Sequence, residues 1–255
     1  MTARAQTNDT GSWRVTLSPR RNPCGGLAVR VAGEACVLRC SGAMHVIAHD
    51  LLIVADLHLE KGSAFAVRGQ MLPPYDTAAT LMRLEDEIAT LNPARVVLLG
   101  DSFHDRAAVP RLSVDDRERL GRMAFGRDWI WLEGNHDKAA LEADALHLPG
   151  RVIGGMTVGA LRLVHEPEPG DQPEKVFGEV AGHLHPAARV AAYGRGVRRP
   201  CFVTDGNRIV LPAFGAFTGG LNVRDPAIAG LFASAPMAAA LGRDKVHPLA
   251  WETLR

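Results

Sequence analysis

Five short apolar runs occur along this chain, and each is followed, directly or after one glycine, by a side chain that can bind a metal ion. The runs are Leu51–Ala55, Arg95–Leu99, Trp129–Leu132, Leu161–Val164 and Glu179–Ala181. Short, branched apolar runs are typical of strands that are buried on both faces of a sheet. Ligands of open α/β sheets bind beyond the carboxyl ends of the strands. We therefore expect the polar residues after these runs to meet at one rim.

The residues that follow the five runs are carboxylates, carboxamides, imidazoles or glycines, apart from two leucines. In chain order they are Asp56-Leu57-His58, Gly100-Asp101, Glu133-Gly134-Asn135-His136-Asp137, His165 and Gly182-His183-Leu184-His185. Each cluster alone has an ordinary interpretation as a helix cap, a turn or a surface residue. Their ordered occurrence after successive strands favours one shared metal site.

The spacing within these clusters is consistent with metal binding. Asp56 and His58 are two residues apart, so on an extended backbone their side chains project to the same side. His183 and His185 have the same spacing. Glycine precedes Asp101, Asn135 and His183, and we expect these glycines to let the backbone approach the site closely. Oxygen and imidazole donors without thiolate suit Mn²⁺, Fe or Zn²⁺.

Helical patterns alternate with the first strands. Asp76 or Thr77 is expected to cap a helix that ends at Asn92-Pro93, because apolar residues recur there with a 3.6-residue period. Ser113 is expected to begin a second helix that runs to about Ala124 in capping-box fashion. Residues 137–146 are a third candidate helix. This order of elements indicates an α/β sandwich with mixed β-sheets.

The last part of the chain is richer in strands. The stretch from Val176 to Phe217 contains several glycines, with a hairpin turn predicted at Asp205-Gly206. Asp225-Pro226 is expected to begin a late helix that Pro236 interrupts. Residues 1–25 are polar and are predicted to be a flexible N-terminal arm. Residues 26–255 are predicted to form a single domain.

Composition sets broad limits on function. The chain has 255 residues, of which 47% are hydrophobic and 22% charged, which is an ordinary globular balance. Its net charge of +1 neither requires nor excludes a polyanionic partner. The N-terminus lacks the pattern of a signal peptide, and the sequence contains no apolar run long enough to span a bilayer. We therefore expect a cytoplasmic protein whose four cysteines are reduced thiols rather than disulfides or metal ligands.

The ordered motifs DLH, GD, GNHD, H and GHLH, which span residues 56–185, resemble the signature of calcineurin-like metallophosphoesterases. The resemblance implies an αββα sandwich of two mixed β-sheets flanked by helices, holding two divalent metal ions. It implies one metal bound by Asp56, His58, Asp101 and His185, and a second bound by Asp101, Asn135, His165 and His183. It also implies that His136 binds no metal and gives a proton to the leaving oxygen.

The sequence departs from the family at one position. The family commonly places an aspartate three residues after the aspartate of the GD motif, where it orients the histidine that corresponds to His136. This chain has His104 there, and Asp105 follows it. The partner of His136 is therefore left open.

A narrower resemblance covers more of the chain. The segments ADLHLEKGSAFAVRG, LPPYDTAAT, LGDSFHD, GHLHP and LPAFGAFTGG resemble a bacterial subgroup called PdeM, the ligase-associated DNA damage response endonucleases. GDSFHD is that subgroup's form of the second motif, so His104 agrees with it. The resemblance implies manganese-dependent phosphodiester hydrolysis on DNA. It also implies association with an ATP-dependent DNA ligase and an Lhr-type helicase.

The sequence also allows other interpretations. The same metals would serve a small-molecule phosphomonoesterase or a cyclic-nucleotide phosphodiesterase, and some proteins of this fold are inactive scaffolds. Basic residues outside the motifs could follow a phosphate backbone or could simply be solvated. They are Lys61, Arg68, Arg189, Arg195, Arg198 and Arg199, the last four lying around Tyr193.

Overall fold

Two β-sheets form the centre of the protein. The computed structural model describes residues 25–70, 72–73, 75–135, 141, 147–169, 177–192 and 195–254. The first sheet has seven strands in chain order, antiparallel from β1 to β4 and parallel from β4 to β7. They are β1 (Leu27–Val31), β2 (Glu34–Leu38), β3 (Met44–Val46), β4 (Leu51–Val54), β5 (Arg95–Leu99), β6 (Asp128–Leu132) and β7 (Arg151–Ile153), with a short 3-10 helix, Ile47–His49, before β4.

The second sheet is also mixed. Its order is β14-β11-β12-β13-β10-β9-β8, and β15 joins it by pairing with both β12 and β16. The pairs β9–β10, β10–β13 and β11–β14 are parallel, and the others are antiparallel. The strands are β8 (Met156–Val158), β9 (Leu161–Val164), β10 (Gly178–Ala181), β11 (Pro186–Ala192), β12 (Arg195–Thr204), β13 (Arg208–Val210), β14 (Leu221–Asn222), β15 (Met237–Leu241) and β16 (Val246–Ala250).

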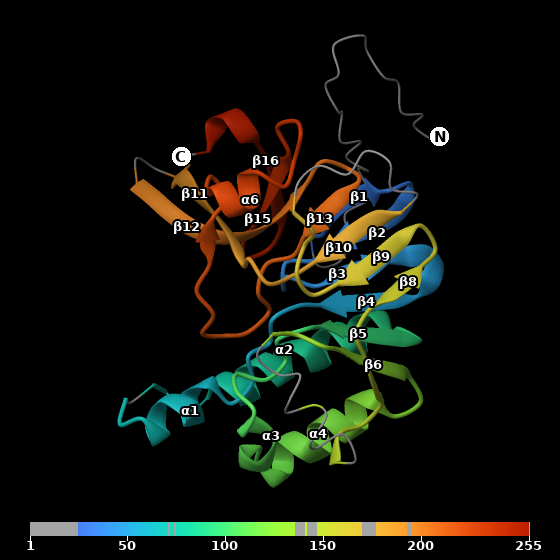
Figure 1. Cartoon of the computed structure of the whole chain (residues 1–255), viewed down its shortest axis with the longest axis vertical. Helices are drawn as coiled ribbons and strands as arrows, with labels where there is room; N and C mark the ends of the chain where they lie inside the picture. Colours follow the sequence, from blue (N-terminus) through green and yellow to red (C-terminus); the bar gives the residue numbers. More distant parts are fainter. Residues whose placement is uncertain are drawn as a thin grey trace.

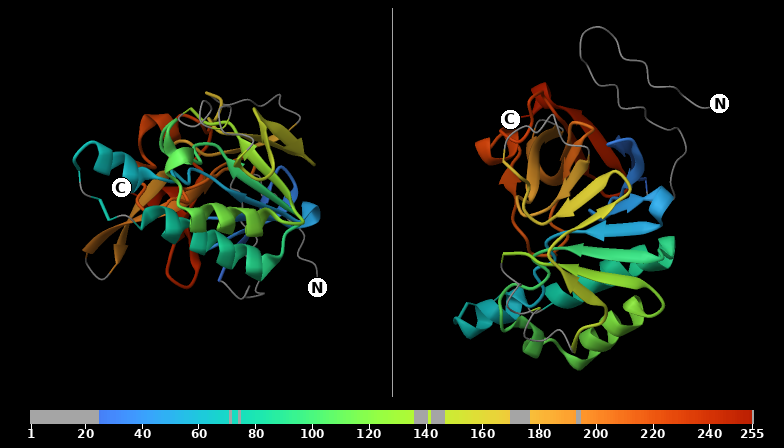
Figure 2. Two further views of the ribbon diagram at one scale, coloured as in Figure 1. Left: turned by 90° about the horizontal axis from the view of Figure 1, so that it is seen from below. Right: turned by 45° about the vertical axis from the view of Figure 1, so that its right-hand side comes forward.

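The sheets are stacked, and helices cover the first one (Figures 1 and 2). Alternate residues of β4 show why: Leu51 and Ile53 pack into the core between the sheets, whereas Leu52 and Val54 pack against the helices. The helices on this side are α1 (Lys61–Val67), α2 (Asp76–Leu91), α3 (Ala108–Arg111) and α4 (Val114–Ala124). The expected α/β sandwich of two mixed sheets with helices is confirmed.

The outer face of the second sheet has a thinner cover. A third apolar cluster lies there, around the short helix α6 (Pro226–Ala229) and the C-terminal 3-10 turn Trp251–Thr253. Asp225 caps α6 as expected, by accepting a hydrogen bond from the Ala227 amide. The expected extension of this helix to Pro236 is wrong, because α6 ends at Ala229. The apolar residues after Pro236 form β15 instead and pair with β12.

Helix α2 forms where the apolar period predicts it, but its expected side-chain cap is wrong. Tyr75 precedes the helix, and no side chain caps it. The Asp76 carboxylate accepts a hydrogen bond from the Gly62 amide, and the Thr77 hydroxyl donates to Glu60. Both side chains therefore hold α1 against α2 instead of capping α2.

The other local predictions vary in outcome. Ser113 caps α4 by accepting a hydrogen bond from the Asp116 amide, as expected. The turn at Asp205-Gly206 joins β12 to β13, and Gly206 takes the positive φ of 95° that favours glycine there. The candidate helix over residues 137–146 lies outside the described residues, apart from Leu141. Residues 1–24 also lie outside them, so the N-terminal arm stays a prediction.

One buried ion pair fixes α2 to the first sheet. The Arg39 guanidinium, which follows β2, lies 2.6 Å from the Glu87 carboxylate of α2, and both side chains are at most one-tenth exposed. Within the described part of the chain, no helix is long and apolar enough to cross a membrane.

Candidate metal centre

The loops after β4 and β5 run side by side at the carboxyl edge of the first sheet. The amide of Asp56 donates to the Gly100 carbonyl, and the amide of His58 donates to the Asp101 carbonyl at 2.9 Å. Because both loops are held by backbone hydrogen bonds, the motifs DLH and GD are fixed next to each other regardless of their side chains.

The second sheet supplies its loops to the same place. The Gly182 amide, after β10, donates to the carbonyl of His165, which follows β9. The next amide, that of His183, donates to the Asp56 carboxylate of the first sheet at 2.9 Å. This bond connects the two sheets at their shared carboxyl edge.

Five of the expected ligands have left-handed backbone conformations. The φ angles are 54° for Asp56, 45° for His58, 46° for Asp101, 68° for His183 and 46° for His185. The expectation that an extended backbone places Asp56 and His58 on one side, and likewise His183 and His185, is therefore wrong, although all four side chains do reach the site. Strained conformations of this kind persist where surrounding contacts impose them, and they cluster at functional sites.

The glycines before the expected ligands allow the close packing that the sequence predicted. A Cβ on Gly100 would lie 2.2 Å from the Nδ1 atom of His165, and one on Gly134 would lie 2.2 Å from the Asp101 amide nitrogen. A Cβ on Gly182 would lie 2.6 Å from the Asp56 carboxylate. The three loops thus approach to distances that only glycine permits.

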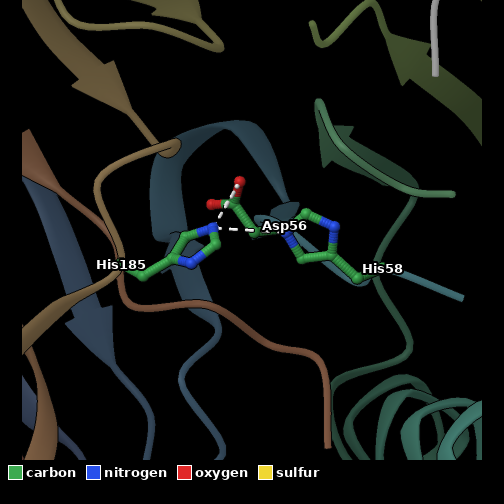
Figure 3. A group of neighbouring side chains, drawn as sticks. All are labelled: Asp56, His58 and His185. Atoms are coloured by element: carbon green, nitrogen blue, oxygen red, sulfur yellow. Dashed lines mark hydrogen bonds and ion pairs between the residues drawn. The ribbon is translucent and has the colours of Figure 1, made fainter. Parts of the chain in front are cut away.

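Asp56, His58 and His185 form the first group of side chains that could hold a metal ion. The His185 Nε2 atom lies 3.1 Å from Asp56 Oδ1 and 3.3 Å from His58 Nε2. Figure 3 shows the two rings pointing toward each other from different loops, beside the carboxylate. Donor atoms of two imidazoles and one carboxylate therefore converge on one point.

Asp101, His165 and His183 form a second group. The His165 Nε2 atom lies 3.4 Å from Asp101 Oδ1 and 3.2 Å from His183 Nδ1. The other oxygen of Asp101, Oδ2, lies 4.0 Å from His58 Nε2 of the first group. The Asp101 carboxylate thus faces both groups.

The donor set fits a pair of divalent ions. Two ligands of one ion, each bound at about 2.1 Å, lie roughly 3.0–3.4 Å apart, and the distances within each group match this spacing. Asp56 is fully buried and Asp101 nearly so. Two carboxylates removed from water are stabilised by positive charge beside them, which bound cations would provide.

The two buried histidines differ in protonation. Burial and the nearby His185 lower the pKa of His58 to about 3, so this ring is neutral and can offer a lone pair. Burial also lowers the pKa of His165, but the hydrogen bond to Asp101 and the charge of Asp56 outweigh it and raise the pKa to about 9. Metal binding at His165 therefore displaces a proton.

Comparison with known proteins identifies the family. A family model for the calcineurin-like phosphoesterases matches residues 49–207. The chain belongs to this family. Its members are hydrolases that use divalent metals, in agreement with the two groups of ligands described above. No curated protein matches the sequence.

Two solved structures are similar to this phosphoesterase. Nuclease MPE from Pseudomonas putida is 30% identical, with a TM-score of 0.69, and the match covers 88% of this chain and 100% of that chain. Yfce, a phosphoesterase from E. coli, is 18% identical, with a TM-score of 0.40 over 78% of this chain and 98% of that chain.

The remaining expected site residues are less fully placed. Asn135 lies on an exposed turn after β6, and its amide donates to the Glu166 carboxylate at 3.3 Å, beside His165. His136 lies outside the described residues. Six of the eight expected residues are thus assembled in the two groups, and Asn135 contacts the neighbour of one of them.

Asp105 has a partner that the sequence did not indicate. Both of its carboxylate oxygens accept hydrogen bonds from Arg111, at 3.1 Å and 3.0 Å. Although burial alone would raise the pKa of Asp105, these bonds lower it below its usual range. His104 instead lies near the metal centre, its ring 6.0 Å from that of His58.

The segment Leu211–Gly220 forms another wall of the phosphoesterase site. Its Phe214 amide donates to the Ala55 carbonyl, and its Gly215 amide donates to the Asp56 carbonyl. Just beyond it, the Leu221 amide donates to the His185 carbonyl. Sequence reasoning gave this segment no role of its own, and the only signal was the resemblance of LPAFGAFTGG to the PdeM subgroup.

Proposed function

We propose that this phosphoesterase hydrolyses phosphodiester bonds in DNA as an endonuclease, using two divalent metal ions. The observation that carries the proposal is the position of the Asp101 carboxylate, which faces two groups of ligands contributed by both sheets. The similarity to nuclease MPE over most of the chain supports a nucleic acid substrate.

The proposed ligand sets follow the two groups. Asp56, His58 and His185 would hold one ion, and His165 and His183 would hold the other. Asp101 would be shared by both, and Asn135 would complete the second set. The hydrogen bond from the His183 amide to Asp56 would keep the two sets in register.

The chain's own side chains and backbone would hold the metal ions and transfer a proton. The buried Asp56 and Asp101 carboxylates would hold the two ions at the rim, and the left-handed loop backbone orients the histidines around these carboxylates. His136 would give a proton to the departing sugar oxygen, a step typically worth about 10²–10⁴-fold in rate. Bound divalent metals supply activation of water and neutralisation of phosphate charge.

The finer assignments are also part of the proposal. Manganese is the proposed metal, because oxygen and imidazole donors without thiolate suit it, as they also suit Fe or Zn²⁺. We propose membership of the PdeM subgroup, and with it a cytoplasmic role in DNA repair beside an ATP-dependent ligase and an Lhr-type helicase. The motif segments around Asp56, Asp101 and His185 support this assignment.

A nicking assay on closed circular DNA tests the proposal. The intact chain is incubated with Mn²⁺, Mg²⁺ or Zn²⁺ beside Asp101→Ala, and the metal content of both proteins is measured. Asp86→Ala, on an exposed position of α2, is the matched control for loss of a carboxylate. We expect Asp101→Ala to lose bound metal and cutting, and Asp86→Ala to retain both.

The outcome also separates the alternatives. Metal-dependent hydrolysis of p-nitrophenyl phosphate or a cyclic nucleotide without cutting of circles would replace the proposal with a small-molecule phosphoesterase. Metal binding without hydrolysis of any ester would indicate a scaffold.

A further inference from the structure

Beside the metal centre, the hairpin of β11 and β12 begins one residue after His185. The hairpin, which is part of the second sheet, and α1 lie on the same side of the molecule in Figure 1. Arg189 of β11 and Arg198 of β12 are directly opposite each other in the antiparallel register. Cross-strand partners share one face of a sheet, so both guanidinium groups lie on the same face of the hairpin.

This arrangement is costly without an anion. Like charges directly opposite each other destabilise a strand pair. Both arginines are exposed, and among the residues that the structure describes neither forms an ion pair with a carboxylate. Arg198 donates a hydrogen bond to the Gly220 carbonyl, which leaves its other donors available. A phosphate near both guanidinium groups would relieve their repulsion.

A pocket connects this face to the metal centre. Its lining includes His185, Ala187, Arg198, Pro200, Thr218 and Gly220. Ala187 pairs with Pro200, two residues from the Arg189–Arg198 pair, so all four belong to one hairpin face. A group that occupies the pocket would therefore lie against a proposed metal ligand, His185, and against Arg198 of the arginine pair.

Thr218, Gly219 and Gly220 also line the pocket, and two of the three offer only backbone. A Cβ on Gly220 would lie 2.6 Å from the His185 carbonyl, so glycine is required for this close approach. A Cβ on Gly219 would meet nothing within 4 Å, so this position opens into free space. Bare backbone and the Thr218 hydroxyl leave room for a bulky, polar substrate group.

We propose that this face binds a phosphate of the nucleic acid strand that adjoins the phosphate being cleaved, with Arg189 and Arg198 as its cationic ligands. The inference rests on the proposed nuclease function and adds the position of the nucleic acid strand on the protein. Guanidinium groups suit phosphate because their planar N–H donors can form paired, charge-assisted hydrogen bonds. The strand would leave the metal centre along the pocket toward the hairpin.

Arg199 provides a matched control. It is exposed and lies on the same strand, but it pairs with Ala188 and so belongs to the opposite face. Arg189→Ala, Arg198→Ala and Arg199→Ala each remove one positive charge from the hairpin. The general electrostatic attraction of nucleic acid to the protein therefore falls equally in all three variants. They differ only in the face of the hairpin from which the charge is lost.

The experiment compares kcat/KM with Mn²⁺ for a short oligonucleotide and for bis-p-nitrophenyl phosphate, which carries a single phosphate. We expect the ratio of oligonucleotide to bis-p-nitrophenyl phosphate to fall roughly tenfold in Arg189→Ala and Arg198→Ala, the effect of one lost charge-assisted hydrogen bond. In Arg199→Ala it should fall less than about twofold, because a solvated charge contributes little. Arg198→Lys, which keeps the charge, should recover part of the loss.

A second pair of variants does not depend on the arginines. Gly219→Asp places a carboxylate at the pocket wall without steric conflict, and Gly121→Asp places one on the exposed face of α4, where a Cβ also meets nothing. The ratio should fall in Gly219→Asp alone. Equal ratios for Arg198→Ala and Arg199→Ala, or for the two aspartates, in a wild type that cuts the oligonucleotide would overturn the inference and leave the nuclease function standing. A wild type that hydrolyses only bis-p-nitrophenyl phosphate would overturn both.

Discussion

Replacing Gly134 with alanine should disrupt the metal centre although the change adds only one methyl group. The new Cβ would lie 2.2 Å from the Asp101 amide nitrogen and 2.4 Å from the Asp101 Oδ1 atom. Gly134 does not have a positive φ, so alanine meets no backbone strain there. Any effect of the substitution therefore comes from contact with Asp101.

The size of the effect follows from the displacement. Cβ contacts in proteins essentially never fall below 3.0 Å, so Gly134 or Asp101 must move by at least 3.0 − 2.2 = 0.8 Å. Metal sites tolerate ligand distances within about 0.2 Å, so Asp101 as displaced would no longer serve both groups. Misplacing a catalytic group by about 1 Å can cost about 10²-fold in rate. We expect a loss of that order in kcat/KM, together with weaker Mn²⁺ binding.

The assay combines Mn²⁺ titration by calorimetry with hydrolysis of bis-p-nitrophenyl phosphate. Gly154→Ala is the matched control, because a Cβ at this exposed position comes no closer than 3.7 Å to its nearest neighbour, the Glu133 carboxylate. Circular dichroism and thermal melting show whether each variant is folded. A folded Gly134→Ala protein with wild-type Mn²⁺ affinity and turnover would refute the proposed role of Asp101.

Two further predictions concern stability. Arg39→Ala leaves the buried Glu87 carboxylate without a counter-charge. This should lower the free energy of unfolding, measured by urea denaturation, by about 3–5 kcal/mol. A loss below about 1 kcal/mol, the level of exposed ion pairs, would contradict the burial of this pair. The pKa of Asp128 is lowered chiefly by hydrogen bonds from Arg151. The ionised carboxylate therefore stabilises the fold at any pH above the unfolded pKa of about 3.9. This contribution disappears as the pH falls through the lower pKa of the folded state. Asp128→Asn should therefore be less stable than the wild type at pH 7, by up to about 1 kcal/mol because the ion pair is exposed. The difference in stability should vanish at acid pH, and a difference that does not change with pH would contradict this reasoning.

Elements with strong local patterns could be predicted from the sequence. Leu51–Val54 is apolar and buried at every position, as is Arg95–Leu99 after its first residue, and α2 carries a clear helical period. The strand at Met237–Leu241 was not predicted, because five residues of mostly alanine carry no period and gain their strand conformation by pairing with β12. The side chain of Asp76 was misassigned for a similar reason, because its partner is the distant Gly62 amide.

The candidate site shows the same division. The donor types and the glycines beside them are visible in the sequence, and their order along the chain carries the family signature. The left-handed backbone at Asp56 and His58 was not foreseen, because only contacts from neighbouring loops make that conformation stable. The wall formed by Leu211–Gly220 likewise depends on hydrogen bonds to residues far away in the chain.

By itself, the sequence determined which chemical groups follow the buried strands, and therefore that these groups suit a hard or borderline metal ion. Only the tertiary structure decided that Asp101 faces both groups of histidines and that Arg198 lines the same pocket as His185. The reason is physical. The identity of a donor is a property of one residue, whereas the distance between two donors depends on how two sheets stack and which strands pair.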